Sequence, residues 1–281
     1  MTLKKRRIQF HKLLSSHYTQ DEIGVYFEML CEAYLDYTSA QVVLNLDKEL
    51  SIEKDAQFIA ALKALQKNEP IQYIIGTVMF AGIVLTVDKR VLIPRPETEE
   101  LVHWLLSASD NETQLRVVDI GTGSGCVAIA LKKARPNWKV TAWDVDLDAL
   151  ATARYNAKKN NVNVNFEVVD VLGKQLPNTN WDIIVSNPPY VPKSEKVHTA
   201  AHVLREPEHA IFVSESSPLK FYEHIINYAA KQLNTKGSIY LEGHAPLMKT
   251  LYLLLTQARF SDIVLRNDFR TNPRFIRAHS R

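Results

Sequence analysis

The segment Leu115–Ala134, LRVVDIGTGSGCVAIALKKA, combines a strand pattern, a glycine-rich loop and a helix pattern. LRVVDI is rich in β-branched residues and predicts a buried strand, whereas SGCVAIALKKA predicts a helix. Between them, Gly121, Gly123 and Gly125 let the backbone approach a ligand closely and leave helix N–H groups pointing at it. The alternative is a tight strand–helix turn without a ligand.

Strands and helices continue to alternate after this unit. Strands are predicted in WKVTAWDV, VNFEVVD, WDIIVSN and GSIYLEG, and helices in DLDALATARYNAKKN, SPLKFYEHIINYAAKQL and APLMKTLYLLLTQA. The final segments, DIVLRND and RFIRAHS, predict a hairpin that closes the sheet. Alternating strands and helices predict an α/β fold, with a mainly parallel seven-stranded sheet and helices on both faces.

The first third of the chain does not show this alternation of strands and helices. DEIGVYFEMLCEAYL (Asp21–Leu35) and SIEKDAQFIAALKALQK predict helices, and VMFAGIVLTVDKRVLI predicts a hairpin. PRPETEELVHWLL predicts another helix with Pro96 at its start and acidic residues in its first turn, where the helix dipole favours them. We therefore expect a helical domain over residues 1–76, a β-hairpin linker over 77–96 and an α/β domain over 97–281.

Composition narrows the class of protein. The 281 residues carry a formal net charge of +3, and this mild basicity permits an acidic partner such as RNA without arguing for one. The two cysteines, Cys31 and Cys126, lack CxxC spacing, so neither a disulfide framework nor a zinc site is indicated. No apolar run is long enough to span a membrane. We expect a cytoplasmic protein that binds no metal and no membrane.

Acidic residues follow the predicted strands beside the glycine loop. Asp144 ends the strand in TAWDVD, at the position where a carboxylate of a doubly wound fold binds the ribose diol of a ligand. Asp146 is the alternative residue for this role, or it simply caps the next helix. Asp170 ends FEVVD, where the adenine of a nucleoside would lie, and a plain turn residue is the alternative there. The loop spacing is GxGxG, and Cys126 stands where the dinucleotide fingerprint GxGxxG has glycine, which disfavours NAD.

In the segment WDIIVSNPPYVPK, a predicted strand is followed directly by Asn187, Pro188, Pro189 and Tyr190. A strand cannot continue through two prolines, because proline lacks an N–H and fixes φ. An NH₂ group needs two acceptors, which Asn187 Oδ1 and the Pro188 carbonyl can supply, while the Tyr190 ring can pack on a planar amide or base. Adenine N6, guanine N2 and a glutamine amide all fit this arrangement, and a rigid strand exit is the alternative.

Together, DIGTGSG, Asp144 and NPPY resemble class I S-adenosylmethionine-dependent methyltransferases that methylate amino groups. VLIPRPETEELV and the upstream PIQYIIG resemble the release factor glutamine methyltransferases, the HemK/PrmC family, and the resemblance covers nearly the whole chain. REPEHAIF and NDFRTNPRFIRA are also similar to segments of that family. The resemblance implies an enzyme that methylates the amide nitrogen (N5) of the GGQ glutamine in bacterial-type peptide-chain release factors.

The resemblance also implies roles for individual residues. It makes Asn187, Pro188 and Tyr190 catalytic, and these three with Pro189 would bind the substrate. The expected contacts to S-adenosylmethionine are Asp119, Gly121, Thr122, Gly123, Ser124, Gly125, Asp144, Asp170, Val171 and Asn187. At Val171 the family often has an aromatic residue, so plain apolar contact would replace stacking on adenine. VSESSP likewise stands where the family often has a glycine-rich stretch.

Residues 1–76 would recognise the release factor, and we expect a monomer without stable nucleic-acid binding. Other functions share parts of these motifs. An amino-methyltransferase acting on adenine or guanine in DNA or rRNA would also carry NPPY, but it should have a basic target-reading region. A non-catalytic nucleoside-binding protein would keep the glycine loop without needing NPPY. An NAD-dependent oxidoreductase is disfavoured by Cys126.

Overall fold

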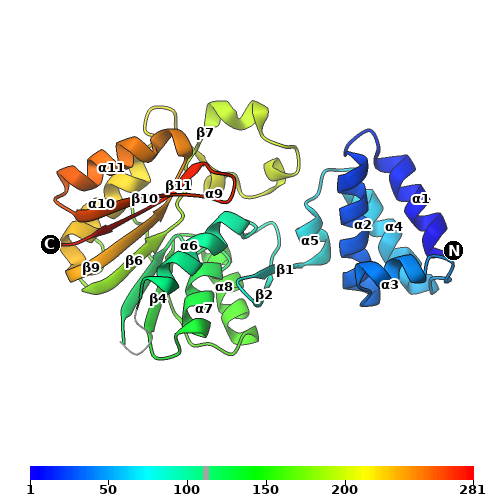
Figure 1. Cartoon of the computed structure of the whole chain (residues 1–281), viewed down its shortest axis with the longest axis horizontal. Coiled ribbons are helices and arrows are strands. Elements are labelled where there is room, and N and C mark those ends of the chain that lie inside the picture. The colour runs from blue at the N-terminus through cyan, green and yellow to red at the C-terminus, as the bar shows by residue number, and fades with distance from the viewer. Residues whose placement is uncertain (110–113) are drawn as a thin grey trace. The chain divides into compact units, whose positions relative to one another are not determined.

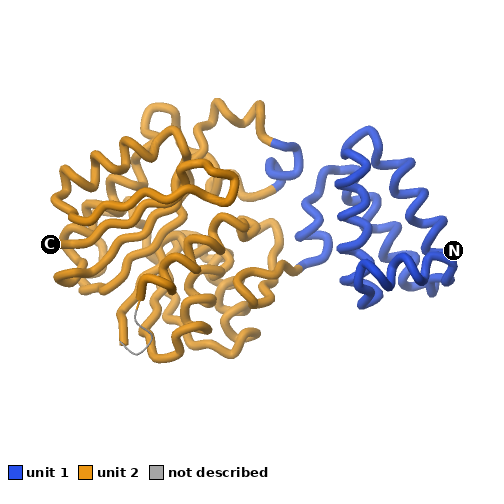
Figure 2. Tube along the Cα trace, in the orientation of Figure 1, with its two compact units in different colours: residues 1–76, 200–205 blue, residues 77–199, 206–281 orange. Residues whose placement is uncertain are grey.

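The computed structural model describes residues 1–109 and 114–281. The chain forms two compact units (Figure 2): residues 1–76 with 200–205, and residues 77–199 with 206–281. The hairpin that follows Gly76 therefore belongs to the second unit. The division into a recognition domain, a linker and a catalytic domain stays a prediction.

The first unit is helical and has its own core. The helix predicted over Asp21–Leu35 is confirmed as α2, which begins with a capping box between Thr19 and Glu22. The core of this unit contains an aromatic cluster in which Phe10 and Phe58 pack around Phe27. The helices are α1 (Leu3–Leu14), α2 (Gln20–Leu35), α3 (Ser39–Leu44), α4 (Ile52–Leu65), α5 (Ile71–Ile75) and the 3₁₀ turn η2 (Val203–Arg205).

The second unit is built on the predicted seven-stranded sheet, whose strand order is β10-β11-β9-β6-β3-β4-β5. The five strands from β9 to β5 are parallel, and β11 and β10 close the sheet antiparallel. The strands are β3 (Arg116–Ile120), β4 (Lys139–Asp144), β5 (Asn165–Val168), β6 (Trp181–Ser186), β9 (Leu233–Glu242), β10 (Ser261–Asn267) and β11 (Pro273–His279).

Helices cover both faces of this sheet (Figure 1). On one face α6 (Pro96–Ser107), α7 (Cys126–Ala134) and α8 (Leu147–Lys159) bury residues such as Leu105 and Ile129. On the other face α10 (Lys220–Gln232) and α11 (Met248–Gln257) bury residues such as Ile225 and Leu251. Burial of both faces explains why the central strands are continuous apolar runs.

The smaller elements of this unit precede the seven-stranded sheet or lie between its strands along the sequence. Pro96 is at the first position of α6, as predicted, because its missing N–H is unpaired there in any helix. The elements are the paired strands β1 (Thr77–Phe80) and β2 (Ile83–Thr86), β7 (Val191–Pro192) paired with β8 (Phe212–Val213), the 3₁₀ turns η1 (Lys193–His198) and η3 (Ala245–Leu247), and α9 (Glu208–Ile211).

The hairpin β1–β2 is fastened to α8 by one buried amide. The Thr86 N–H donates to Asn156 Oδ1 at 2.7 Å, and Asn156 Nδ2 donates to the carbonyls of Thr86 at 2.9 Å and Ser124 at 3.0 Å. One side chain thus connects the hairpin, α8 and the glycine loop. Across the two described stretches of chain, no helix has the length and apolar content needed to cross a membrane.

Candidate active site

A cavity of about 300 Å³ opens where β3, β4, β5 and β6 end at their carboxyl termini. This is the edge of an open parallel sheet where ligands bind. The lining includes most of the predicted site residues: Asp119, Gly121, Thr122, Gly123, Ser124, Asp144, Asp170, Val171, Asn187, Pro188 and Pro189. Gly125 and Tyr190 are outside this lining. The structure therefore brings together the residues that the sequence groups at the ends of four strands.

The three glycines of the loop between β3 and α7 have different structural roles. All three have positive φ values, and an added Cβ would meet nothing within 4 Å at Gly121 or Gly123. At Gly125 a Cβ would lie 2.8 Å from Ile129 Cδ1 and 3.1 Å from Ala153 Cβ. The first two glycines therefore leave space at the cavity, whereas the third allows α7 to pack closely against α8.

Asp119 is buried beneath the loop at the end of β3. Its Oδ2 accepts from the Thr122 hydroxyl at 2.6 Å and from the Ala128 N–H at 3.2 Å. Burial raises the pKa of this carboxyl to about 7, and the nearby Asp144 charge acts in the same direction. The loop is thus held by an acid that can change its charge near neutral pH.

Asp144 and Asp146 have separate tasks. Asp144 accepts from the Gly123 N–H at 2.8 Å through Oδ2 and from the Asp146 N–H at 3.0 Å through Oδ1. Burial raises the pKa of this group, and the backbone hydrogen bonds from Asp146 and Gly123 oppose that shift. Asp146 caps α8 by accepting from two backbone N–H groups, and it also lies 3.3 Å from His209 Nε2. Asp144 is therefore the strand-end acid of the cavity, and Asp146 is the helix cap.

Asp170 follows β5, which ends at Val168, two residues earlier than the predicted strand. Its Oδ1 accepts from the Leu172 N–H at 2.9 Å, and its carbonyl accepts from the Gly173 N–H at 2.8 Å. The residue therefore makes a turn and lines the cavity as well. Beside it, Val171 and Leu172 supply an apolar wall.

Asn187 stands directly after β6 and faces the cavity together with Pro188 and Pro189. Its Nδ2 donates to Thr98 Oγ1 at 3.0 Å, and the Thr98 hydroxyl donates to Glu242 Oε2 at 2.8 Å. Within the described residues, no donor bonds Asn187 Oδ1. The amide is thus fixed through its nitrogen, and its oxygen is left as an acceptor.

Tyr190 contacts the glutamate that holds Thr98, the hydrogen-bond partner of Asn187. Its hydroxyl donates to Glu242 Oε1 at 3.2 Å, and its ring stacks on His244 with centroids 6.1 Å apart. The Arg274 guanidinium lies 5.9 Å from the ring centroid. In this structure the tyrosine contacts the support of Asn187, and its ring does not line the cavity.

Two buried glutamates near the cavity were not identified from the sequence. Glu206 accepts from the Ile93 N–H at 2.9 Å and pairs with Arg95 at 2.5 Å, which fixes the segment before α6 at the cavity wall. Glu242 ends β9 and contacts Thr98 and Tyr190. A charged residue at the end of an apolar strand, as in IYLEG, is the signal that could have located Glu242.

Two family models match separate parts of the chain. Residues 8–76 match the PrmC N-terminal domain, and residues 100–259 match the methyltransferase small domain. The second match covers more than half of the chain.

Individual proteins match over longer stretches. A release factor glutamine methyltransferase from Flavobacterium psychrophilum is 39% identical, covering 100% of both chains. One from Bacteroides thetaiotaomicron is 37% identical, covering 95% of this chain and 96% of its own. Among solved structures, a methyltransferase from Pyrococcus furiosus has a TM-score of 0.52 at 19% identity and covers 81% of this chain and 98% of its own, which shows the shared fold.

Proposed function

We propose, from the premise that this chain belongs to the family of release factor glutamine methyltransferases, that it methylates a glutamine side chain of peptide-chain release factors. The acceptor atom is the amide nitrogen (N5) of the GGQ glutamine, and the methyl donor is S-adenosylmethionine. The observation that carries the proposal is the orientation of Asn187, whose nitrogen is bound by Thr98 while its oxygen is left for a substrate NH₂ group.

The cavity fits S-adenosylmethionine in size and chemistry. Its volume of about 300 Å³ is in the range of small-molecule sites. Asp144 would accept from the ribose hydroxyls, Asp170 from the adenine amino group, and Val171 would contact the flat base. The open space at Gly121 and Gly123 would let the loop lie against the ligand. When bound, S-adenosylmethionine supplies a methyl group on a cationic sulfur as the electrophile.

The work of the protein at the acceptor is positioning. An amide nitrogen is a weak nucleophile because its lone pair is delocalised, as the rotation barrier of ~18–20 kcal/mol indicates. Asn187 Oδ1 and the Pro188 carbonyl would accept one N–H each, which holds the plane of the amide and turns its nitrogen face toward the methyl group. The nitrogen loses one proton to water as it gains the methyl group, so a protein base is not required.

The helical unit would recognise the body of the release factor. We propose residues 1–76 as this recognition domain, 77–96 as a hairpin linker and 97–281 as the catalytic domain. We further propose that the enzyme acts as a cytoplasmic monomer without stable nucleic-acid binding. Removal of residues 1–76 should then raise the release factor concentration needed for half-maximal rate and leave S-adenosylmethionine binding intact. Full activity of this shortened chain at low release factor concentration would contradict the recognition role.

The deciding experiment is methyl transfer from labelled S-adenosylmethionine to four acceptors in parallel. These are a release factor, its Gln→Ala variant in GGQ, duplex DNA and rRNA. We expect label only in the unaltered release factor. Equal labelling of the Gln→Ala variant would refute glutamine as the acceptor, and preferential labelling of DNA or rRNA would instead support the nucleic-acid alternative.

A further inference from the structure

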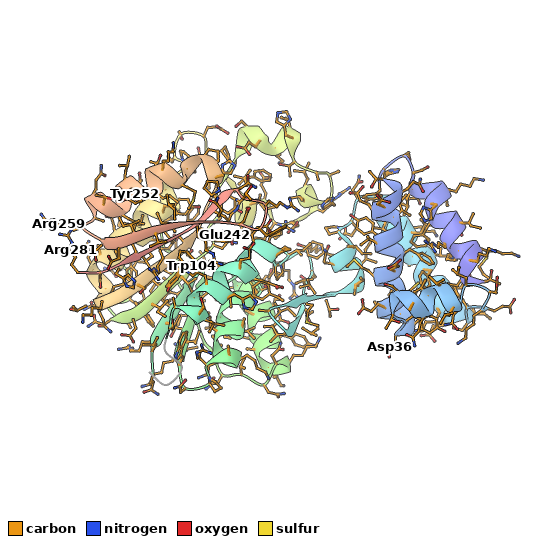
Figure 3. All side chains as sticks on the ribbon, in the orientation of Figure 1. Asp36, Trp104, Glu242, Tyr252, Arg259 and Arg281 are labelled. Atoms are coloured by element: carbon orange, nitrogen blue, oxygen red, sulfur yellow. The ribbon has the colours of Figure 1, made fainter. Side chains whose placement is uncertain are left out.

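Glu242 is a buried charge that the proposed reaction leaves unused. It ends β9, is 1% exposed and lies beside the first turn of α6 (Figure 3). Thr98 donates to its Oε2 at 2.8 Å, and Tyr190 donates to its Oε1 at 3.2 Å. These donors come from α6 and from the segment after β6, so three separate parts of the fold meet at one carboxyl group.

The ionised carboxylate sets the direction of the whole hydrogen-bond chain. A carboxylate only accepts, so the single proton of the Thr98 hydroxyl is directed toward Glu242. Thr98 Oγ1 can then only accept from Asn187, and the part of that amide able to donate is Nδ2. Asn187 Oδ1 is consequently turned away from Thr98 and kept as an acceptor.

We propose that Thr98 and Glu242 are positioning residues that hold the Asn187 amide with its oxygen toward the substrate NH₂ group. This inference rests on the proposed function, because it assumes that the substrate presents N–H donors to Asn187. Protonation of Glu242 reverses the chain: the carboxyl donates to Thr98, and the Thr98 proton turns toward Asn187 Oδ1. Asn187 then presents its own NH₂ to that of the substrate, and donor faces donor.

The surroundings of Glu242 place this reversal near neutral pH. Burial is the largest influence and raises its pKa to about 7, although Thr98, Arg274 and Tyr190 each favour the charged form. The pKa is raised, so the carboxylate that orients Asn187 is present above about pH 7 and is lost as the pH falls through that value. The titratable and charged groups around it are Glu97 on α6, Cys126 on α7, Tyr190 after β6, Tyr222 on α10, His244 after β9 and Arg274 on β11.

The first test is a matched pair of substitutions at Thr98. Thr98→Val keeps the shape and removes the hydroxyl, whereas Thr98→Ser keeps the hydroxyl. In single-turnover transfer at saturating S-adenosylmethionine and release factor, we expect Thr98→Val to be about 10- to 100-fold slower and Thr98→Ser to stay within about threefold of the unaltered enzyme. Equal rates for Val and Ser would overturn the proposal.

The second test is the pH dependence of the same step in Glu242→Gln, which keeps the size of the side chain but does not ionise. The unaltered enzyme should lose rate as the pH falls from about 8 to about 6, whereas the variant should be slower at about pH 8 and show no such loss. This readout separates orientation of Asn187 from a merely structural role, which would lower the rate equally at every pH. An unchanged acid limb in Glu242→Gln would overturn the role of Glu242. Should either buried variant fail to fold, the other still decides the matter.

The single-turnover rate of Asn187→Ala, measured in the same experiments, distinguishes failure of this inference from failure of the proposed function. If Asn187→Ala transfers at the normal rate, the proposed use of Asn187 itself fails. If Asn187→Ala is slow while Thr98→Val is not, only the positioning chain fails. Melting temperature and S-adenosylmethionine affinity of each variant show whether the cavity is intact.

Discussion

Asp119 and Glu242 are two buried carboxyl groups in the same unit, and both have pKa values raised to about 7 by burial. They are held in different ways. The donors to Asp119 come from Thr122 and Ala128, three and nine residues further along the chain. The donors to Glu242 come from Thr98 and Tyr190, which are 144 and 52 residues away. The cofactor end of the cavity, at the glycine loop and Asp144, is therefore built from neighbouring strand–loop–helix units, whereas the acceptor end, at Asn187, forms only when α6, β6 and β9 are packed together.

The largest expected effect is at the acceptor end. Asn187→Ala removes one acceptor and leaves a substrate N–H unpaired, so single-turnover transfer should slow by ~10²–10³-fold, as when one preorganised polar contact is deleted. S-adenosylmethionine affinity should change little, because the glycine loop and Asp144 belong to the other end. Asn187→Asp keeps an acceptor but adds charge, and we expect an intermediate loss. A large loss of cofactor affinity in Asn187→Ala would show that the two ends are not separate.

The next effect is at the cofactor end. Asp144→Ala should weaken S-adenosylmethionine binding by ~1.5–3 kcal/mol, because a charged acceptor for the ribose is lost. Asp146→Ala is the matched control: it removes the cap of α8, which costs ~1 kcal/mol of the free energy of unfolding, and should leave the affinity nearly unchanged. Calorimetry that finds equal affinities for Asp144→Ala and the unaltered protein would refute the assignment of Asp144.

The same contrast explains what the sequence could predict. The loop, Asp144 and the sheet were predictable because each depends on patterns within about one strand–helix unit. The contact between Thr98 and Asn187 was not, since it joins residues 89 positions apart whose meeting depends on how α6 packs on the sheet. The direction of the Tyr190 ring was not predictable either, because the side chain contacts His244 and Glu242, which come from β9 and the segment after it.

A smaller effect should distinguish Gly125 from Gly123 at the cofactor end of the cavity. Gly125→Ala would place a Cβ 2.8 Å from Ile129 Cδ1 at a φ of +83°, so we expect the free energy of unfolding to fall by ~1–3 kcal/mol. Gly123→Ala meets no atom within 4 Å at a φ of +53° and should cost only ~1 kcal/mol, with its main effect on cofactor affinity. Urea unfolding without cofactor compares the two variants. A larger loss in Gly123→Ala than in Gly125→Ala would contradict the packing role of Gly125.

The last expected effect is the pH dependence that Asp119 gives to the cofactor-free protein. Its pKa is raised from 3.8 to about 7, so between these values the folded chain keeps a proton that the unfolded chain has lost. Stability from this group is therefore present at low pH and is lost as the pH rises through about 7. Asp119→Asn removes this titration and keeps a side chain that can accept from Thr122. Relative to the variant, the unaltered protein should lose at least ~1 kcal/mol of its free energy of unfolding between about pH 5 and about pH 8. Because Glu242 titrates in both proteins, it cancels in the difference, and a difference that stays constant with pH would show that Asp119 is already ionised throughout that range.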